Sequence, residues 1–500
     1  IPVSSFLTAP PTPSPKTPPE KVGPVNATST PPRLLSPPVK AILGNLGFVL
    51  QFAGVLLLIP AVLATVFEDT TTATGIYLTT VLLLVTGFFL NSYGEKSSLN
   101  LQQASILVFL SLFLLTLFGT VPYLYVFPSD ETNIEVFANA FFSSAAGFTT
   151  GGISLIDEPE KLSQSFTFYR SYTQLVGGMS FIYLVITAFY PESKLQSMRG
   201  FISGRTLHMK ELFLTITIIF AVYIIIVAVL LYLFGSRNPI SEFSPEHLID
   251  NFSLAMSTLA TGGFTPTSTI LDNLLWQEHV ILMGAMILGA LPFTFHYAFV
   301  RKKFLSPKLG KEVLTYFAIL AAATVLFAVI SGLDPMQSAF YSVSASTTAG
   351  LQMESLAGLS GGAHTILIIL MFIGGCGFST AGGLKIFRLF HLKDIIPFFS
   401  KIKRAELSKQ SKKELLSTLI ILALFPTISA ITGAHLAAIE DVPFQDAFFE
   451  AVGIITTGGL SAGVIDSDTD PATMIVLGFL MIFGRLEIIA IIYIFVPRLS

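Results

Sequence analysis

Residues 139–152 read NAFFSSAAGFTTGG, and this stretch decides the fold because the chain repeats it three more times in one register. The counterparts are DNFSLAMSTLATGG at 250–263, QSAFYSVSASTTAG at 337–350 and DAFFEAVGIITTGG at 446–459. Each segment is amphipathic, is too short to cross a membrane, and ends in threonine and small residues. A long apolar run precedes each segment and another follows it. The sequence therefore predicts a unit of helix, short segment and helix, built four times.

The four segments also share features inside the repeat. Small residues occupy two common positions: Ser144, Ala255, Ser342 and Ala451 at the first, and Ala146, Ser257, Ser344 and Gly453 at the second. Small side chains let neighbouring backbones approach closely. Each segment opens with a side-chain carbonyl or carboxylate, which predicts helix caps at Asn139, Asp250, Gln337 and Asp446.

The composition is that of a chain solvated mainly by lipid. Of its 500 residues, 52% are hydrophobic and 12% are charged, whereas soluble domains carry about 25% charged residues. Apolar runs long enough to cross a bilayer lie near 41–67, 73–92, 101–127, 166–190, 211–234, 276–300, 312–331, 364–391, 413–439 and 472–495. The sequence therefore predicts an all-α polytopic membrane protein with ten transmembrane helices. The short segments near 134–148, 247–259, 335–346 and 443–455 are predicted to be re-entrant pore loops.

Charged residues alternate between two kinds of loop. Basic residues gather near 194–210, 301–311 and 385–413 and in the first 40 residues; acidic residues gather near 68–69, 130–131, 157–160 and 466–470. The positive-inside rule assigns the basic loops to the cytoplasm. We therefore expect a multi-pass protein of the cell membrane with both termini in the cytoplasm.

The repeats divide the chain into segments. Residues 1–40 are rich in proline, serine and threonine and are predicted to be a disordered extension. An N-terminal helix pair, 41–93, precedes repeat 1 (94–190), repeat 2 (191–300), repeat 3 (301–391) and repeat 4 (392–500). The predicted architecture is thus four helix, pore loop, helix repeats around one pore, with two additional helices at the N-terminal end.

The ends of the four segments are the candidate ion site. They comprise Thr149, Thr150, Gly151, Gly152, Ala260, Thr261, Gly262, Gly263, Thr347, Thr348, Ala349, Gly350, Thr456, Thr457, Gly458 and Gly459. Glycine reaches backbone conformations that a β-carbon forbids, and four such turns around an axis can aim carbonyl oxygens at a dehydrated cation. The expected ligand is a weakly hydrated monovalent cation. For any single turn the alternative is ordinary helix packing, but four turns in one register favour a selectivity filter.

A second glycine-rich stretch interrupts the apolar run 364–391. This glycine-rich loop comprises Gly374, Gly375, Cys376, Gly377, Phe378, Ser379, Thr380, Ala381, Gly382 and Gly383. Unwound backbone at membrane depth must line a cavity, and glycine allows a change of position at low steric cost. We expect the loop to be a gate; the alternative is a helix kink or a close helix contact.

Arg485 lies in the middle of the last apolar run. An arginine at the bilayer centre costs about 2.5–3.5 kcal/mol, so its side chain should face a partner or water. Below a filter it would repel cations and limit leakage. The alternative is a structural ion pair with Glu487 or Glu450. Four of the seven histidines, His279, His296, His364 and His435, show no metal-ligand spacing and are interpreted as interfacial or packing residues.

At the four turns the sequence resembles the Trk/Ktr/HKT family of potassium transporters. Three further stretches are similar to family motifs: Arg170 followed by QLVGGM at 174–179, GGCGFSTAGGLK at 374–385, and FGRLE at 483–487. Leu175 stands where a tryptophan is usual. The additional N-terminal helix pair favours the Trk branch over the Ktr branch, and the resemblance covers residues 41–500.

The resemblance implies roles for individual residues. The filter glycines of the family correspond to Gly152, Gly263, Gly350 and Gly459, and the loop at 374–383 corresponds to the intramembrane gate. Members with serine at the first filter glycine tend to be sodium-selective, so Gly152 favours potassium. Ala349 differs from the glycine of the other three turns and makes the ring asymmetric.

The resemblance also implies partners. Trk-type pores are usually homodimers that assemble with a cytoplasmic ring of nucleotide-binding subunits of the TrkA type, and the basic 385–413 loop is a candidate docking surface. No cofactor, nucleic-acid partner or enzymatic activity is expected, because the chain has no phosphate-binding loop and no arranged acid pair or metal ligands. With its single cysteine, Cys376, it cannot form an intrachain disulfide.

The predicted function is potassium uptake through the filter, gated by the glycine-rich loop and regulated by a cytoplasmic partner. The alternative is a secondary transporter that moves potassium or sodium by ion symport. Many such transporters are built from inverted halves, whereas this repeat runs four times in one orientation.

Overall fold

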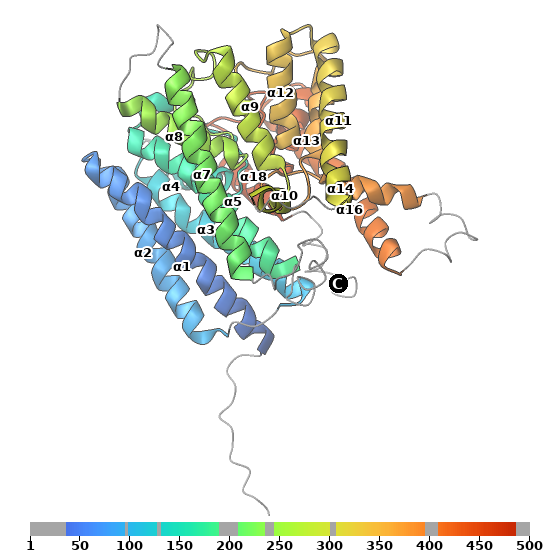
Figure 1. Ribbon diagram of the computed structural model, residues 1–500. Coiled ribbons are helices and arrows are strands. Elements are labelled where there is room, and N and C mark those ends of the chain that lie inside the picture. Colours follow the sequence, from blue (N-terminus) through green and yellow to red (C-terminus); the bar gives the residue numbers. More distant parts are fainter. Residues whose placement is uncertain are drawn as a thin grey trace, which may run out of the picture. The chain divides into compact units, whose positions relative to one another are not determined.

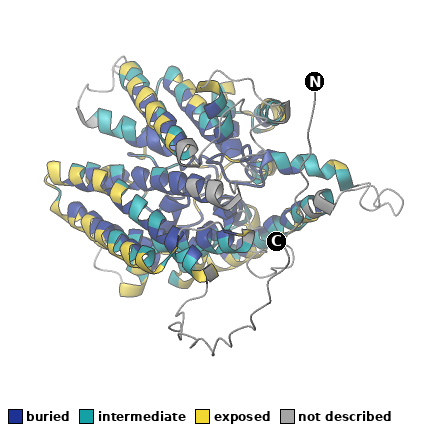
Figure 2. Ribbon diagram, turned by 60° about the horizontal axis from the view of Figure 1, so that its bottom comes forward, coloured by how far each residue is buried: buried dark blue, intermediate teal, exposed yellow. Residues whose placement is uncertain are grey.

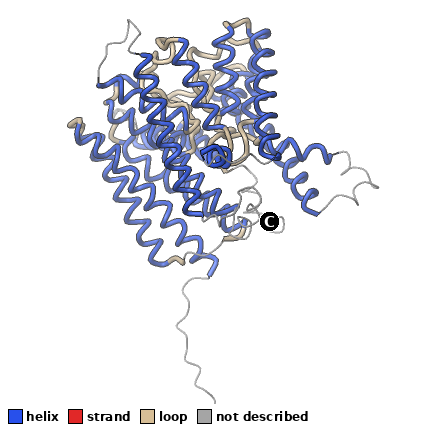
Figure 3. Tube along the Cα trace, in the orientation of Figure 1, coloured by secondary structure: helices blue, strands red, loops and turns tan. Residues whose placement is uncertain are grey.

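The computed structural model describes residues 37–95, 99–127, 132–189, 209–235, 245–300, 307–395 and 409–486. These residues are largely helical and include no strand (Figure 3). The predicted disordered extension lies outside the described residues as far as Ser36, and helix α1 begins at Pro37. The all-α prediction is therefore confirmed for the part of the chain that the structure describes.

Long apolar helices make up most of the fold (Figure 1). Among the described residues, six helices are long and apolar enough to cross a membrane: α1 (Pro37–Val66), α2 (Thr70–Tyr93), α3 (Leu101–Leu124), α7 (Met209–Gly235), α11 (Pro307–Ser331) and α16 (Lys409–Ile439). A seventh span is the pair α9 (Trp276–Ala290) and α10 (Phe293–Val300), which bend by 104° at their break. Six or seven spans, by length and composition, make this a multi-pass membrane protein.

The three remaining predicted spans differ from these for local reasons. Helix α5 (Gln164–Phe189) is long enough but carries buried polar residues such as Arg170 and Gln174, which lower its hydropathy. Helix α13 (Gly361–Ile373) ends where the glycine-rich loop begins. Helix α18 (Pro471–Arg485) is described only as far as Leu486. The count of ten transmembrane helices therefore stays a prediction.

Four short helices lie where the sequence predicts the pore segments. They are α4 (Asn133–Phe148), α8 (Pro245–Leu259), α12 (Pro335–Thr347) and α17 (Phe444–Ile455). They contain 12 to 16 residues. At this length a helix is shorter than the hydrocarbon core of a bilayer, unlike the long apolar runs predicted before and after each of them.

The predicted caps of these helices are wrong, because each helix begins before the residue expected to cap it, by two residues in α12 and α17 and by five or six in α8 and α4. Helix α4 is capped by Thr132, which forms a capping box with Glu135, and α12 is capped by Asp334. Asn139 lies inside α4, where its Nδ2 donates to the carbonyl of Ser467 at 2.9 Å. Local propensity identified polar residues near each helix start but not which of them caps it.

Each short helix packs against three neighbours, and the pattern is the same in all four repeats. Helix α4 contacts α3, α5 and α18; α8 contacts α7, α9 and α5; α12 contacts α11, α13 and α9; α17 contacts α16, α18 and α13. In each case the third neighbour is the helix that follows the short helix of the preceding repeat. The contact of α4 with α18 joins the first repeat to the last and closes the cycle.

The buried and exposed residues divide as expected for a protein surrounded by lipid. The short helices and the turns after them are buried, and the exposed positions follow the outward faces of the peripheral helices (Figure 2). Many exposed residues are large and apolar, among them Val62, Val81, Ile225, Leu314 and Val329. Water would make such surfaces unfavourable, whereas hydrocarbon accommodates them.

Candidate ion site and glycine-rich loop

All four short helices end in the same hydrogen-bonded turn. In the first, the Thr150 N–H donates to the Gly147 carbonyl at 3.0 Å and the Gly151 N–H donates to the Ala146 carbonyl at 2.8 Å. This pair of bonds is a Schellman C-cap. The bond that spans five residues recurs in the other turns at 2.8, 3.0 and 2.7 Å, from Gly262, Ala349 and Gly458. Its acceptors are Ser257, Ser344 and Gly453, so the second small position of the repeat is where each turn folds back.

The left-handed position of each turn is a threonine. Thr150, Thr261, Thr348 and Thr457 have φ angles of 56°, 54°, 53° and 50°. A β-branched residue rarely adopts positive φ, at a cost of about 1–3 kcal/mol each. Four equivalent outliers in one protein show that the same strained turn is formed in every repeat.

Two residues after each threonine comes a glycine with positive φ. These four residues, Gly152, Gly263, Gly350 and Gly459, are called the glycine ring below; their φ angles are 76°, 90°, 72° and 71°. A Cβ added to Gly152 would lie 2.3 Å from the Gly262 carbonyl oxygen, and one on Gly263 would lie 2.4 Å from that of Ala349. One on Gly350 would lie 3.0 Å from the Gly458 oxygen, and one on Gly459 would lie 3.1 Å from the Gly151 oxygen.

These contacts form a closed cycle. Each ring glycine faces the carbonyl of the residue before the ring glycine of another repeat, in the order first to second, second to third, third to fourth and fourth to first. Four turns that are far apart in the sequence therefore meet through their backbones. The structure brings together all sixteen residues of the candidate ion site; fifteen of them are buried and Gly263 is half-buried.

The threonine hydroxyls of the turns fall into two groups with different hydrogen bonding. Thr149, Thr347 and Thr456 donate their hydroxyls to carbonyls of their own short helices at 2.6, 2.7 and 2.7 Å. By contrast, the hydroxyls of Thr150 and Thr457 are buried and make no hydrogen bond to the described residues. The first group stabilises the helix ends, whereas the second has hydroxyl oxygens without a hydrogen-bond partner among the described residues.

Helix α5 supports the first and second turns. The Arg170 side chain is 2% exposed, donates from Nη2 to the Ser154 hydroxyl at 2.5 Å, and lies 4.5 Å from the ring centroid of Phe264. One turn further along α5, Gln174 Nε2 donates to the Gly262 carbonyl at 2.8 Å. Both residues belong to a motif of the resembling family, but no local sequence pattern predicts that they contact the turns.

A different set of polar residues supports the fourth turn. Both carboxylate oxygens of Glu450 accept from the Ser461 hydroxyl, at 2.8 and 3.0 Å, and Oε2 accepts from the Ala462 N–H at 2.8 Å. The Ser461 N–H donates to the Gln352 side chain at 2.9 Å, which links the third turn to the fourth. Glu450 therefore accepts hydrogen bonds from the segment that directly follows the fourth turn.

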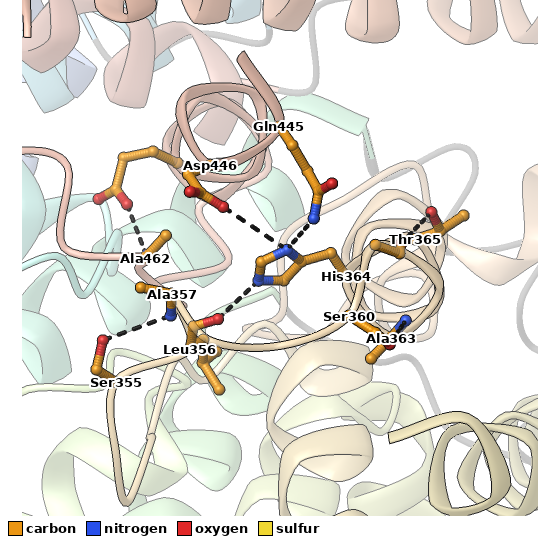
Figure 4. Close-up of polar contacts among 12 residues, drawn as sticks. Ser355, Leu356, Ala357, Ser360, Ala363, His364, Thr365, Gln445, Asp446 and Ala462 are labelled. Atoms are coloured by element: carbon orange, nitrogen blue, oxygen red, sulfur yellow. Dashed lines mark hydrogen bonds and ion pairs between the residues drawn. The ribbon is translucent and has the colours of Figure 1, made fainter. Parts of the chain in front are cut away.

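His364 connects α13 to the start of α17 (Figure 4). Its Nε2 bonds the Leu356 carbonyl at 2.8 Å, and its Nδ1 lies 2.8 Å from Gln445 Nε2. His279 makes the equivalent bond in repeat 2, from Nε2 to the Leu271 carbonyl at 2.9 Å. In both repeats the histidine holds the loop that follows the turn, as expected of a packing residue.

The glycine-rich loop lies against the candidate ion site. A Cβ added to Gly382 would lie 2.0 Å from the Thr456 carbonyl oxygen and 2.4 Å from Thr457 Oγ1. The Gly382 N–H donates to Thr348 Oγ1 at 2.5 Å, and the Gly383 N–H donates to the Thr456 carbonyl at 3.2 Å. The loop thus contacts the third and fourth turns directly.

Other bonds hold the loop to neighbouring helices. The Gly377 N–H donates to Glu312 Oε1 of α11 at 2.6 Å, and Thr380 Oγ1 donates to the Gly289 carbonyl of α9 at 2.8 Å. The Cys376 N–H donates to the Ala290 carbonyl at 3.0 Å. Lys385, just beyond the loop, is 2% exposed and donates to the Ala381 carbonyl. Phe378 is the loop residue with the most exposed side chain, at 36%.

Arg485 is buried at the end of α18, at 2% exposure. Its guanidinium lies 4.6 Å from the ring centroid of Phe181 on α5. Of the two carboxylates considered as its partners, Glu450 is bonded to Ser461 and Ala462, and Glu487 lies outside the described residues. A cation–aromatic contact is thus one of the interactions that accommodate this buried charge.

Acidic residues line a cavity of about 400 Å³ beside the loop between α1 and α2. Burial raises the pKa of the Asp69 carboxyl, but hydrogen bonds from Ser163, Ser165 and Thr72 outweigh this effect and leave the pKa lowered. Asp69 therefore stays ionised at neutral pH. Within the described ranges, no group of three or more His, Cys, Asp or Glu side chains is arranged to hold a metal ion.

Comparison with known proteins bears on the fold and the family. The model of the family TrkH, cation transport protein, matches residues 79–330 and 311–499, which is most of the chain. The chain belongs to the TrkH family. The TrkH family is one of cation transport proteins and is not an enzyme family.

Relatives from bacteria and an archaeon share this family's sequence over most of their length. An uncharacterized cation transporter of Methanocaldococcus jannaschii is 25% identical over 481 residues, which cover 93% of this chain and 96% of that protein. The Trk system potassium uptake protein TrkH of Escherichia coli K12 is 24% identical over 436 residues, or 81% of this chain and 87% of that one.

A solved structure supports the TrkH fold. The crystal structure of the potassium transporter TrkH from Vibrio parahaemolyticus superposes with a TM-score of 0.71 at 21% identity. The superposition covers 92% of this chain and 99% of that one. The match confirms the Trk-type fold that the sequence resemblance predicts.

Proposed function

We propose that this chain takes up potassium across the cell membrane through a selectivity filter built from Thr149–Gly152, Ala260–Gly263, Thr347–Gly350 and Thr456–Gly459. The observation that carries the proposal is the closed cycle of the glycine ring, in which backbone carbonyls of four repeats meet. Rings of backbone carbonyls replace the hydration shell of a cation. Relatives named as potassium uptake proteins support potassium as the substrate.

The energy for uptake does not require a second substrate. A membrane potential of 100 mV is worth about 2.3 kcal/mol per elementary charge. That energy corresponds to an accumulation of roughly fiftyfold, since about 1.4 kcal/mol is a factor of ten. Acidic loops such as the one at Asp69 would raise the local cation concentration modestly.

The glycine-rich loop and Arg485 are proposed to form the gate. The contacts of Gly382 and Gly383 with Thr348 and Thr456 support this assignment, because the loop occupies space beside two of the four filter turns. The buried charge of Arg485 supports a role in repelling cations from the closed pathway. In the open state the loop would leave the turns while the turns keep their shape.

Orientation and assembly complete the proposal. The charge pattern supports cytoplasmic termini and a basic cytoplasmic surface within 385–413. We propose that this surface docks a TrkA-like ring of nucleotide-binding subunits on a homodimer of the pore chain. A pull-down tests the docking: neutralising Lys409, Lys412 and Lys413 should weaken ring binding, and unchanged binding would count against it.

The proposed filter is tested by ion flux into liposomes that contain the purified full chain. Wild-type protein should admit potassium and rubidium in preference to sodium. Gly152→Ser should raise sodium flux relative to potassium, because the added side chain would displace the Gly262 carbonyl, 2.3 Å from the Cβ position.

Gly332→Ser is the matched control for this variant. Gly332 has a similar φ of 69°, and a Cβ there meets nothing within 4 Å. The control should keep the wild-type flux ratio. If Gly152→Ser kept it as well, the filter assignment would be wrong.

A further inference from the structure

Gln174 lies at the centre of α5 and is completely buried. Its Nε2 donates to the Gly262 carbonyl at 2.8 Å, and its Oε1 accepts from the Phe264 N–H at 3.4 Å. The two bonds flank Gly263, a member of the glycine ring. A polar side chain buried in an apolar helix is costly unless its hydrogen bonds are satisfied, and here the second turn satisfies both ends of the amide.

The acceptor of the first bond is one of the carbonyls that close the cycle. The four carbonyls that face ring glycines belong to Gly151, Gly262, Ala349 and Gly458. In the part of the chain that the structure describes, the Gly262 carbonyl alone among these four accepts a side-chain hydrogen bond. The backbone of the ring is thus nearly the same in all four repeats, but only the carbonyl of the second repeat, Gly262, accepts this side-chain hydrogen bond among the described residues.

Arg170 contacts the same region from the same helix. It lies four residues earlier on α5, and residues four apart share one face of a helix. Its guanidinium contacts Ser154 after the first turn and the Phe264 ring after the second. The α5 surface therefore contacts the turns on both sides of the point where Gly152 meets Gly262.

We propose that Gln174 is a specificity-determining positioning residue, which favours potassium over sodium by holding the Gly262 carbonyl. Two effects act in the same direction. A carbonyl held by an amide cannot move inward to contact a smaller ion, and a carbonyl that shares its lone pair presents a weaker field. Both the size of the ring and the field strength of its carbonyls bear on potassium selectivity. The proposal rests on the filter assignment made above.

The test measures the ratio of potassium to sodium flux in liposomes containing the full chain. Gln174→Leu keeps the volume of the side chain and removes both hydrogen bonds, so the ratio should fall by about fivefold, the size expected for one buried hydrogen bond. The matched control is Gln164→Leu, ten residues earlier on the same helix, where the amide donates to Asp250 at 3.1 Å. This control should leave the ratio unchanged.

Gln174→Glu separates positioning from mere packing. A protonated carboxyl can donate to the Gly262 carbonyl as the amide does, whereas a carboxylate would repel it. The flux ratio of this variant should therefore recover as the bath is made acidic and fall as it is made alkaline, and the wild type should show no such dependence. This readout also decides the case if Gln174→Leu fails to fold.

The outcomes distinguish the two proposals. If Gly152→Ser lowers the ratio while Gln174→Leu does not and Gln174→Glu shows no pH dependence, Gln174 merely packs and this inference is overturned alone. If Gly152→Ser leaves the ratio unchanged, the filter assignment fails and the role of Gln174 fails with it.

Discussion

The glycine ring and the glycine-rich loop are both rich in glycine, but they are held in place by different kinds of contact. Each turn of the ring is held by the Schellman bonds of its own helix and by backbone atoms of another turn. The loop at 374–383 contacts side chains and carbonyls of other elements, including Glu312, Thr348 and Gly289. The turns cannot shift without breaking helix ends, whereas the loop can leave by exchanging a few hydrogen bonds. This difference supports the proposal that the ring is a rigid filter and the loop a movable gate.

A change in the ring should have the largest effect. Gly459→Ala would bring a Cβ to 2.9 Å from Gly350 Cα and 3.1 Å from the Gly151 oxygen. Overpacking of this kind costs about 1–3 kcal/mol, in addition to about 1–2 kcal/mol for a side chain at positive φ. Potassium selectivity in the liposome assay should fall by about tenfold, and the thermal midpoint should drop.

Gly463 provides the control for this prediction. It has a φ of 75°, close to the 71° of Gly459, but a Cβ there would meet open space. Gly463→Ala should therefore show only the strain, with a normal flux ratio. Equal ratios in the two variants would mean that the close backbone contacts do not determine selectivity.

A change in the loop where it meets the turns should have the next largest effect. Gly382→Ala would place a Cβ 2.0 Å from the Thr456 carbonyl. Because the turn is the more rigid of the two, the loop should move, and flux in the absence of a regulatory partner should rise by about tenfold. Gly358→Ala, where a Cβ meets nothing within 4 Å, should not change the flux. A selectivity change without a flux increase would mean that the turn moved instead.

The smallest effect is expected at the far attachment of the loop. Glu312→Ala removes the acceptor of the 2.6 Å bond from Gly377. A typical hydrogen bond contributes about 0.5–1.5 kcal/mol, and its loss should raise flux in the absence of a regulatory partner by about threefold. Thr315→Ala, which removes a hydroxyl bonded within α11 itself, is the control. No rise with Glu312→Ala would show that the loop is held by its contacts with the turns alone.

Much of the fold follows from the sequence because the repeat is local. The four short helices lie where apolar runs and turn residues predict them, and the ring glycines follow from the shared register. The helix caps could not be predicted from the sequence. Asn139 and Asp446 have side chains that can cap a helix, but both lie inside their helices, because tertiary contacts determine where each helix begins. Glu450 illustrates the same limit: the sequence offered Arg485 as its partner, and the fold supplies Ser461 and Ala462.

The contacts around the ring could not be predicted, because they join residues of different repeats. Nothing local to Gln174 indicates that its amide reaches a carbonyl 88 residues away. A buried amide in the middle of an apolar helix was the available signal, and it indicates a need for partners without naming them. Likewise, the sequence shows that Gly152 is a glycine but not that the Gly262 carbonyl fills the space of its absent side chain.

The contact of α4 with α18 has a consequence for synthesis. Asn139 on α4 bonds a carbonyl 328 residues later, and α18 is the last helix described. A nascent chain that has inserted three repeats lacks α18 and the contact that closes the cycle of helices, so the filter proposed above cannot be enclosed until translation has passed α18. A transcript truncated before α18 would therefore yield an open arrangement of helices rather than a closed but unselective pore.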